Sequence, residues 1–146
     1  MNIKTTNNNK YHVNELLKVR KTLISVTAIE GVDLSDHDNE LYDEIMDNLT
    51  DSQDAIYKMT MIELPVLKDN VTRDSVKKAI EEVLEWENKL DSARKDIEST
   101  NYETWEEREL AYKGLHLLLS HKSKAWETLT EELNLEVIYD IFDEYK

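Results

Sequence analysis

Three glutamates, Glu81, Glu82 and Glu85, are the side chains whose type and spacing come nearest to metal chemistry. Residues three and four apart lie on one face of an α-helix, so Glu85 shares a face with both of the others. Mg²⁺ prefers oxygen ligands and needs only one or two protein carboxylates when substrate phosphates supply the rest. This motif is therefore a candidate for metal-dependent nucleotide hydrolysis.

The E-E-x-x-E spacing resembles one half of the Mg²⁺ site of all-α nucleoside triphosphate pyrophosphatases. In that family an E-x-x-D pair follows on a second helix, whereas here such pairs lie upstream, at Glu40/Asp43 and Glu44/Asp47. The downstream carboxylates have only the E-x-x-E spacing: Glu103, Glu106 and Glu109. Because the order is wrong and a chain with 32 acidic residues contains such pairs by chance, a Mg²⁺-dependent pyrophosphatase is an alternative function only.

Other catalytic patterns are missing from the sequence. The chain has no cysteine, which excludes thiolate nucleophiles and thiolate metal sites. Its two glycines are too few for a phosphate-binding loop or a nucleophile elbow. The four histidines do not have the spacing that puts two metal ligands on one helical face: His12, His37, His116 and His121. We therefore expect a non-enzymatic protein with no catalytic residue, no metal ligand and no cofactor.

The strongest charge feature lies between Asp33 and Asp54, where there are nine carboxylates and no Lys or Arg. Six of them advance in steps of three or four residues, which places them on one face of a helix. We call these six the acidic stripe: Asp36, Glu40, Asp43, Asp47, Asp51 and Asp54. Like charges at these spacings destabilise a helix by a few tenths of a kcal/mol each.

Two interpretations of the acidic stripe are open. As a functional surface it would bind a basic groove of another protein by imitating nucleic-acid phosphates, with fast and salt-sensitive association. The imitation is imperfect, because the stripe offers a charge about every 5.4 Å of helix axis and a DNA strand a phosphate about every 3.4 Å. Alternatively it is a solvated face, partly neutralised in the fold by Lys18, Arg20 and Lys21.

Two apolar features are further candidates for binding. Trp86 lies one residue beyond the apolar side of its helix, between Glu85 and Glu87, which predicts an exposed aromatic anchor. The terminal segment 137–145 is dense in large apolar residues, which either close the bundle or dock on a partner or a second copy. A helical assembly or chaperone-like protein that forms a homo-oligomer is therefore a second alternative function.

Helical periodicity predicts the elements that carry these residues. Apolar residues at this spacing predict a first helix over 11–29, ending at Gly31 and preceded by a flexible lead over 1–10. A second helical stretch begins at Ser35 and ends at Pro65. Within it, Thr50 and Gln53 have the spacing of a capping box, which predicts an interruption near residue 50.

The second half of the chain follows the same pattern. Thr72 is the expected cap of a third helix, which runs to about residue 97. Thr104 and Glu107 form another capping box, where the next helical region begins. Gly114 or Ser120 is a candidate kink in that region, and Asn134 is expected to separate it from a terminal helix over 135–145.

The fold class follows from length, punctuation and connections. A chain of 146 residues fits one domain, which we expect over 11–146. Two glycines and one proline are too few for the turns of an all-β fold. Short connections between long amphipathic helices favour antiparallel neighbours. The sequence therefore predicts an all-α, up-down antiparallel helical bundle of about four to five helices.

Charge and hydropathy restrict the partners. A net charge of −14 disfavours direct binding to nucleic acid or to anionic lipid. No apolar run reaches the roughly 18 residues that span a bilayer, and the lack of cysteine fits a reducing compartment, so we expect a cytoplasmic protein that binds no membrane. The function that we predict is an acidic protein-binding module, a phage-type inhibitor that mimics DNA and engages the basic surface of a nucleic-acid-binding protein.

Overall fold

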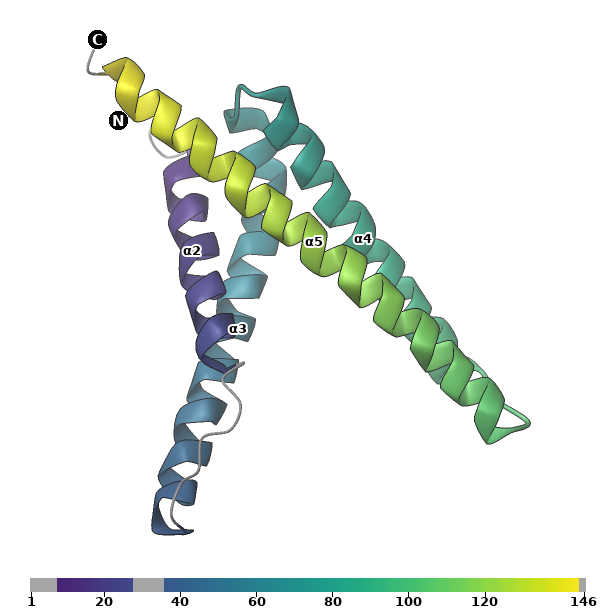
Figure 1. Cartoon of the computed structure of the whole chain (residues 1–146). Coiled ribbons are helices and arrows are strands. Elements are labelled where there is room, and N and C mark those ends of the chain that lie inside the picture. Colours follow the sequence, from purple (N-terminus) through teal and green to yellow (C-terminus); the bar gives the residue numbers. More distant parts are fainter. Residues whose placement is uncertain (1–7, 28–35, 145–146) are drawn as a thin grey trace. The chain divides into compact units, whose positions relative to one another are not determined.

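A computed structural model of the protein describes residues 8–27 and 36–144 (Figure 1). These residues form four α-helices: α2 (Lys10–Thr27), α3 (Asp36–Asn70), α4 (Asp74–Ser99) and α5 (Trp105–Glu144). The prediction of an all-α fold with about four helices is confirmed. The predicted caps Gly31 and Ser35 lie outside the described residues. The chain divides into two compact units, Met1–Asn70 and Val71–Lys146, and the single domain expected over 11–146 stays a prediction.

The first unit is an antiparallel pair of α2 and α3, as Figure 1 shows. The side-chain amide of Asn9 donates to the carbonyl oxygen of Glu63 (3.0 Å) and to its carboxylate (2.6 Å). The amide of Asn70 donates to Asn9 Oδ1 (3.0 Å), so the start of α2 is tied to the end of α3. Asn9 and Lys10 are buried and belong to the packed unit, although the lead was expected to extend to residue 10. The apolar core residues of this unit are Val13, Leu17, Leu64 and Leu67.

The second unit is an antiparallel pair of α4 and α5. In the middle of the pair the indole nitrogen of Trp126 donates to Glu87 Oε1 (2.8 Å), and Lys122 Nζ lies 3.4 Å from the same oxygen. Trp126 is 3% exposed, and Glu87 is also buried. The apolar core around them consists of Val76, Ala79, Ile80, Val83, Leu90, Ala125, Leu129, Leu133 and Val137.

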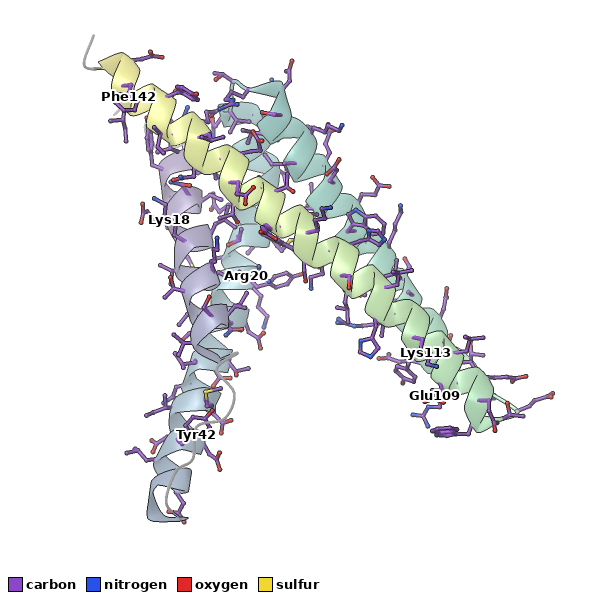
Figure 2. The ribbon with its side chains drawn as sticks, in the orientation of Figure 1. Lys18, Arg20, Tyr42, Glu109, Lys113 and Phe142 are labelled. Atoms are coloured by element: carbon purple, nitrogen blue, oxygen red, sulfur yellow. The ribbon has the colours of Figure 1, made fainter. Side chains whose placement is uncertain are left out.

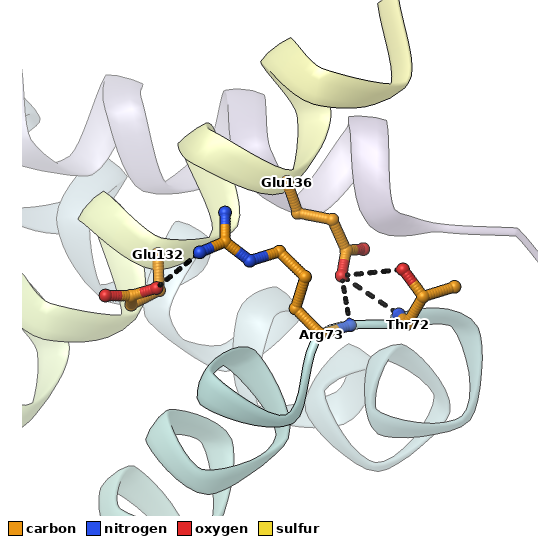
Figure 3. Close-up of polar contacts among 4 residues, drawn as sticks. All are labelled: Thr72, Arg73, Glu132 and Glu136. Atoms are coloured by element: carbon orange, nitrogen blue, oxygen red, sulfur yellow. Dashed lines mark hydrogen bonds and ion pairs between the residues drawn. The ribbon is translucent and has the colours of Figure 1, made fainter. Parts of the chain in front are cut away.

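Helix α4 begins differently from the prediction. Thr72 is not its cap: Arg73 occupies the N-cap position in extended backbone and makes no side-chain capping bond. Instead, the carboxylate of Glu136 on α5 accepts hydrogen bonds from the backbone N–H groups of Thr72 (2.9 Å) and Arg73 (2.8 Å), as Figure 3 shows. An ion pair between Arg73 and Glu132 (3.7 Å) lies beside it. A carboxylate from a different helix therefore binds the free amides at the start of α4.

Two predicted helix breaks are absent. The interruption near residue 50 is wrong, because the hydroxyl of Thr50 donates to the carbonyl of Met46 one turn earlier (2.9 Å) and α3 continues. The break at Asn134 is also wrong, since α5 runs through it with Leu133 and Val137 buried on either side. Helix α5 also runs through Gly114, and the kink suggested there stays a prediction. The capping box at Thr104 is confirmed, because Thr104 Oγ1 accepts from the backbone N–H of Glu107 (3.2 Å).

The predicted end at Pro65 is wrong as well, since α3 passes through it and ends at Asn70. Proline in a helix interior removes one hydrogen bond and costs about 3 kcal/mol. Leu64 and Leu67 on either side are fully buried, so their packing offsets this cost.

Replacing the exposed Pro65 with alanine is expected to raise the free energy of unfolding by about 1–2 kcal/mol, because the missing backbone bond is restored. Urea unfolding followed by circular dichroism measures this change. Thr50→Ala, at another exposed position of the same helix, is the control and should shift stability by less than about 0.5 kcal/mol. A Pro65→Ala variant that is less stable than the wild type would contradict the expectation.

Candidate protein-interaction surface

The acidic stripe lies on one uninterrupted helix. Glu40, Asp43, Asp47, Asp51 and Asp54 are all exposed on α3. Asp36 lies in the first turn of α3, but its side chain is outside the described residues. From Glu40 to Asp54 the stripe extends about 21 Å along the helix axis. The helix thus brings at least these five carboxylates to one solvent-facing surface.

Two of the three bases expected to neutralise the stripe, Lys18 and Arg20, contact other residues. Lys18 pairs with Glu15 on its own helix (3.7 Å), and Arg20 lies over the ring of Tyr57 (5.9 Å). In Figure 2, Lys18 and Arg20 lie on α2 away from the end of α3 that carries Tyr42. Within the described residues, no ion pair joins any of the five exposed stripe carboxylates to a Lys or Arg.

The part of α3 that carries the stripe is also weakly packed. From Glu40 to Met59 no side chain is buried, and Tyr42, Met46 and Leu49 are only half-buried. Full burial begins at Thr60 and continues with Leu64 and Leu67. Repulsion along the stripe therefore costs stability in a stretch that has no fully buried side chain to offset it.

Trp86 is half-buried rather than exposed, contrary to the prediction. The imidazole of His121 stacks on its indole ring with centroids 4.5 Å apart and an interplanar angle of 6°. The ammonium of Lys89 also lies 4.5 Å from the ring centroid. The helix on which Trp86 lies packs against α5, which brings His121 to it. This stack is therefore a contact within the α4–α5 pair.

The exposed tryptophan is instead Trp105, the first residue of α5, with 69% of its surface exposed. Its position directly after the capping residue Thr104, in the first turn of a helix, is the feature of the sequence that could have indicated this exposure. Leu110 and Leu117 on the same helix are also exposed.

The carboxylates considered for Mg²⁺ do not form a metal site with one another. Glu85 pairs with Lys89 (2.8 Å), Glu81 is exposed and Glu82 is half-buried. Over residues 8–27 and 36–144, no three His, Asp or Glu side chains are grouped so that they would hold a metal ion. His12, His116 and His121 are exposed, whereas the side chain of His37 lies outside the described residues.

The terminal segment is divided between core and surface. Val137 is buried in the α4–α5 pair, while Ile138, Ile141 and Phe142 are exposed. Arg73 lies over the ring of the exposed Tyr139 (5.4 Å). Figure 2 shows Phe142 at the C-terminal end of α5. Tyr145 lies outside the described residues. The segment therefore closes the pair with Val137 and presents Ile138, Ile141 and Phe142 to solvent.

Comparison of the chain with protein-family models, with curated proteins and with solved structures finds no match. None of the helices in the described part of the chain combines the length and the apolar character needed to cross a bilayer.

Proposed function

We propose that this protein is a non-enzymatic binding module whose acidic stripe engages a basic surface of a nucleic-acid-binding protein and thereby competes with nucleic acid. A cytoplasmic setting, in which such a partner is found, is part of the proposal. The observation that carries it is a line of exposed carboxylates, Glu40 to Asp54, with no cationic partner among the described residues.

The physical basis is electrostatic. Uncompensated charges along one helix face create a local negative potential that steers a basic partner and accelerates its association. Exposed charges of this kind are screened by salt over about 8–10 Å, so binding should weaken as ionic strength rises. The stripe would take the place of the phosphates that such a partner contacts, and it offers nothing that corresponds to base edges.

A matched pair of charge variants tests the proposal. In the first variant the six stripe residues are changed to Asn or Gln. In the control the same number of exposed acids on α4, α5 and their connection are changed in the same way: Glu98, Glu103, Glu106, Glu109, Glu127 and Glu131. Both variants lose the same net charge, so a difference between them reports position and not total charge.

Affinity capture from host lysate at low salt is the measurement. Wild type and control are expected to retain a basic nucleic-acid-binding protein that is released by high salt and by excess duplex DNA. The stripe variant should bind this protein at least about tenfold more weakly, which corresponds to about 1.4 kcal/mol. The proposal is wrong if the stripe variant retains the same proteins as the control.

A second candidate function, a helical assembly protein, is supported by the exposed terminal residues Ile138, Ile141 and Phe142. Exposed apolar groups that lie close together mark interaction surfaces. The metal-dependent pyrophosphatase remains an untested alternative that no described contact supports. Nucleotide hydrolysis that EDTA and Glu82→Gln both abolish would establish it.

A further inference from the structure

Helix α3 carries an exposed face that is distinct from the acidic stripe. Eight residues advance along it in alternating steps of four and three, and all eight are exposed. We call them the α3 seam: Leu41, Ile45, Asn48, Ser52, Ala55, Met59, Ile62 and Val66. Five of them are large apolar residues, of which Ile62 is 74% exposed. Leu41 and Ile45, near the start of the helix, are also well exposed.

The spacing of the seam is that of a coiled coil. Apolar residues that repeat every 3.5 positions on average form the seam along which two helices pack. The seam extends about 38 Å, over four pairs of such positions. It lies about a third of a turn from the face that carries Leu49, Ile56 and Thr60, which are buried or half-buried in the α2–α3 pair. A further helix on the seam would therefore not compete with α2.

We propose that the occupant of the seam is α3 of a second copy of this chain, in antiparallel orientation. In the register centred between Gln53 and Asp54 all eight positions find a partner. The pairs between the two copies are Leu41 with Val66, Ile45 with Ile62, Asn48 with Met59, and Ser52 with Ala55. Large apolar residues meet in the two outer pairs, and the small residues Ser52 and Ala55 meet at the centre, where they let the two backbones approach.

Charge selects the antiparallel orientation. A parallel pair would set the acidic stretch between Asp33 and Asp54 beside its own copy. The antiparallel pair sets it beside residues 55–70, which contain two lysines and two acids. It also brings the exposed Asp51, at the border of the seam, next to the exposed Lys58 of the second copy, and this contact occurs twice by symmetry.

The dimer does not depend on the proposed function, and the salt dependence of binding distinguishes the two proposals. Binding of a basic partner by the stripe weakens as salt rises. Each copy carries −14, so salt screens the repulsion between copies, while the apolar contacts of the seam are retained. Self-association should therefore persist in high salt, under conditions that release the basic partner.

Sedimentation equilibrium of the full chain tests the seam. The wild type is expected to form a dimer, and Ile45→Asp with Ile62→Asp should raise the dimer dissociation constant by at least about a hundredfold, because four apolar side chains per dimer lose their burial. The matched control is Leu110→Asp with Leu117→Asp, at two exposed leucines of α5. Circular dichroism of all variants checks that the helices are retained. A wild type that stays monomeric, or a dimer that the seam variant does not weaken, overturns the proposal.

Cysteine cross-linking tests the orientation, since the chain has no native cysteine. A mixture of Leu41→Cys and Val66→Cys chains should form a disulfide-linked dimer on oxidation, while Leu41→Cys alone should not. Asp51→Lys should raise the dissociation constant by about threefold to tenfold, and adding Lys58→Asp should restore it. Cross-linking of Leu41→Cys with itself, or no rescue by Lys58→Asp, would overturn the antiparallel pairing.

Discussion

Replacement of Trp126 by alanine is expected to lower the free energy of unfolding by about 3–5 kcal/mol, the largest effect of any single substitution considered for this chain. Trp126 lies in the core of the α4–α5 pair, and its indole N–H donates to the buried carboxylate of Glu87. The substitution leaves a cavity and also removes a donor from Glu87. Since natural domains are stable by only about 5–15 kcal/mol, this variant should be largely or partly unfolded near physiological temperature.

A graded series separates packing from hydrogen bonding at this position. Trp126→Phe keeps most of the apolar volume and should cost about 1–2 kcal/mol, because Glu87 then loses its indole donor. Adding Glu87→Leu to Trp126→Phe should cost less than the sum of the two single changes, since each already breaks the same bond. Urea unfolding measures all of these variants.

The control for this series is Trp105→Ala, because Trp105 is mostly exposed. Its expected effect is within about 0.5 kcal/mol, as for other surface substitutions. If Trp105→Ala and Trp126→Ala destabilise the protein equally, the assignment of Trp126 to the core is wrong.

The second large effect is expected at Glu136, where alanine should cost about 2–4 kcal/mol. Only 1% of Glu136 is exposed, and its Oε1 atom accepts from the backbone amides of Thr72 and Arg73. The hydroxyl of Thr72 also lies 3.4 Å from this oxygen. Removing the buried carboxylate leaves the part-buried backbone donors of Thr72 and Arg73 without this acceptor, which is more costly than losing an exposed bond.

Conservative changes test whether the carboxylate acts as the cap. Glu136→Gln retains one acceptor oxygen and loses the charge, so it should cost less than Glu136→Ala, about 1–2 kcal/mol. Glu131→Ala, at an exposed position on the same helix, is the control. Hydrogen exchange of the first turn of α4 should rise in Glu136→Ala more than exchange of its middle. Equal exchange along the whole of α4 would indicate general destabilisation instead of a lost cap.

Helical periodicity predicted the existence of the helices well, and local signals predicted their ends poorly. Thr50, Pro65 and Asn134 are all residues that often begin or end helices, yet α3 and α5 pass through them. At Pro65 and Asn134 the buried neighbours Leu64 and Leu133 show the reason, because packing contributes more than the local preference costs. At Thr50, which has no buried neighbour, the hydroxyl donates to the carbonyl of Met46 and the helix continues. Thr104, at an exposed helix start without such packing, was predicted correctly.

The candidate surface was predicted in part. The spacing of the stripe residues identifies a shared face, and the structure leaves the described members of that face exposed. Periodicity does not tell which of two apolar faces is covered, so it does not predict that Leu41 and Ile45 are exposed. The position of Trp86 was missed because the partner that covers it, His121, comes from a helix 35 residues further along the chain.

The cap of α4 has a consequence for synthesis on the ribosome. Glu136 follows Arg73 by 63 residues, so the start of α4 is made long before the carboxylate that accepts from the amides of Thr72 and Arg73. Most of the stability of a helix in a protein comes from such tertiary contacts. The start of α4 therefore becomes secure only after nearly the whole of α5 has left the ribosomal tunnel. A ribosome stalled shortly before codon 136 would carry a nascent chain in which this turn is accessible to proteases.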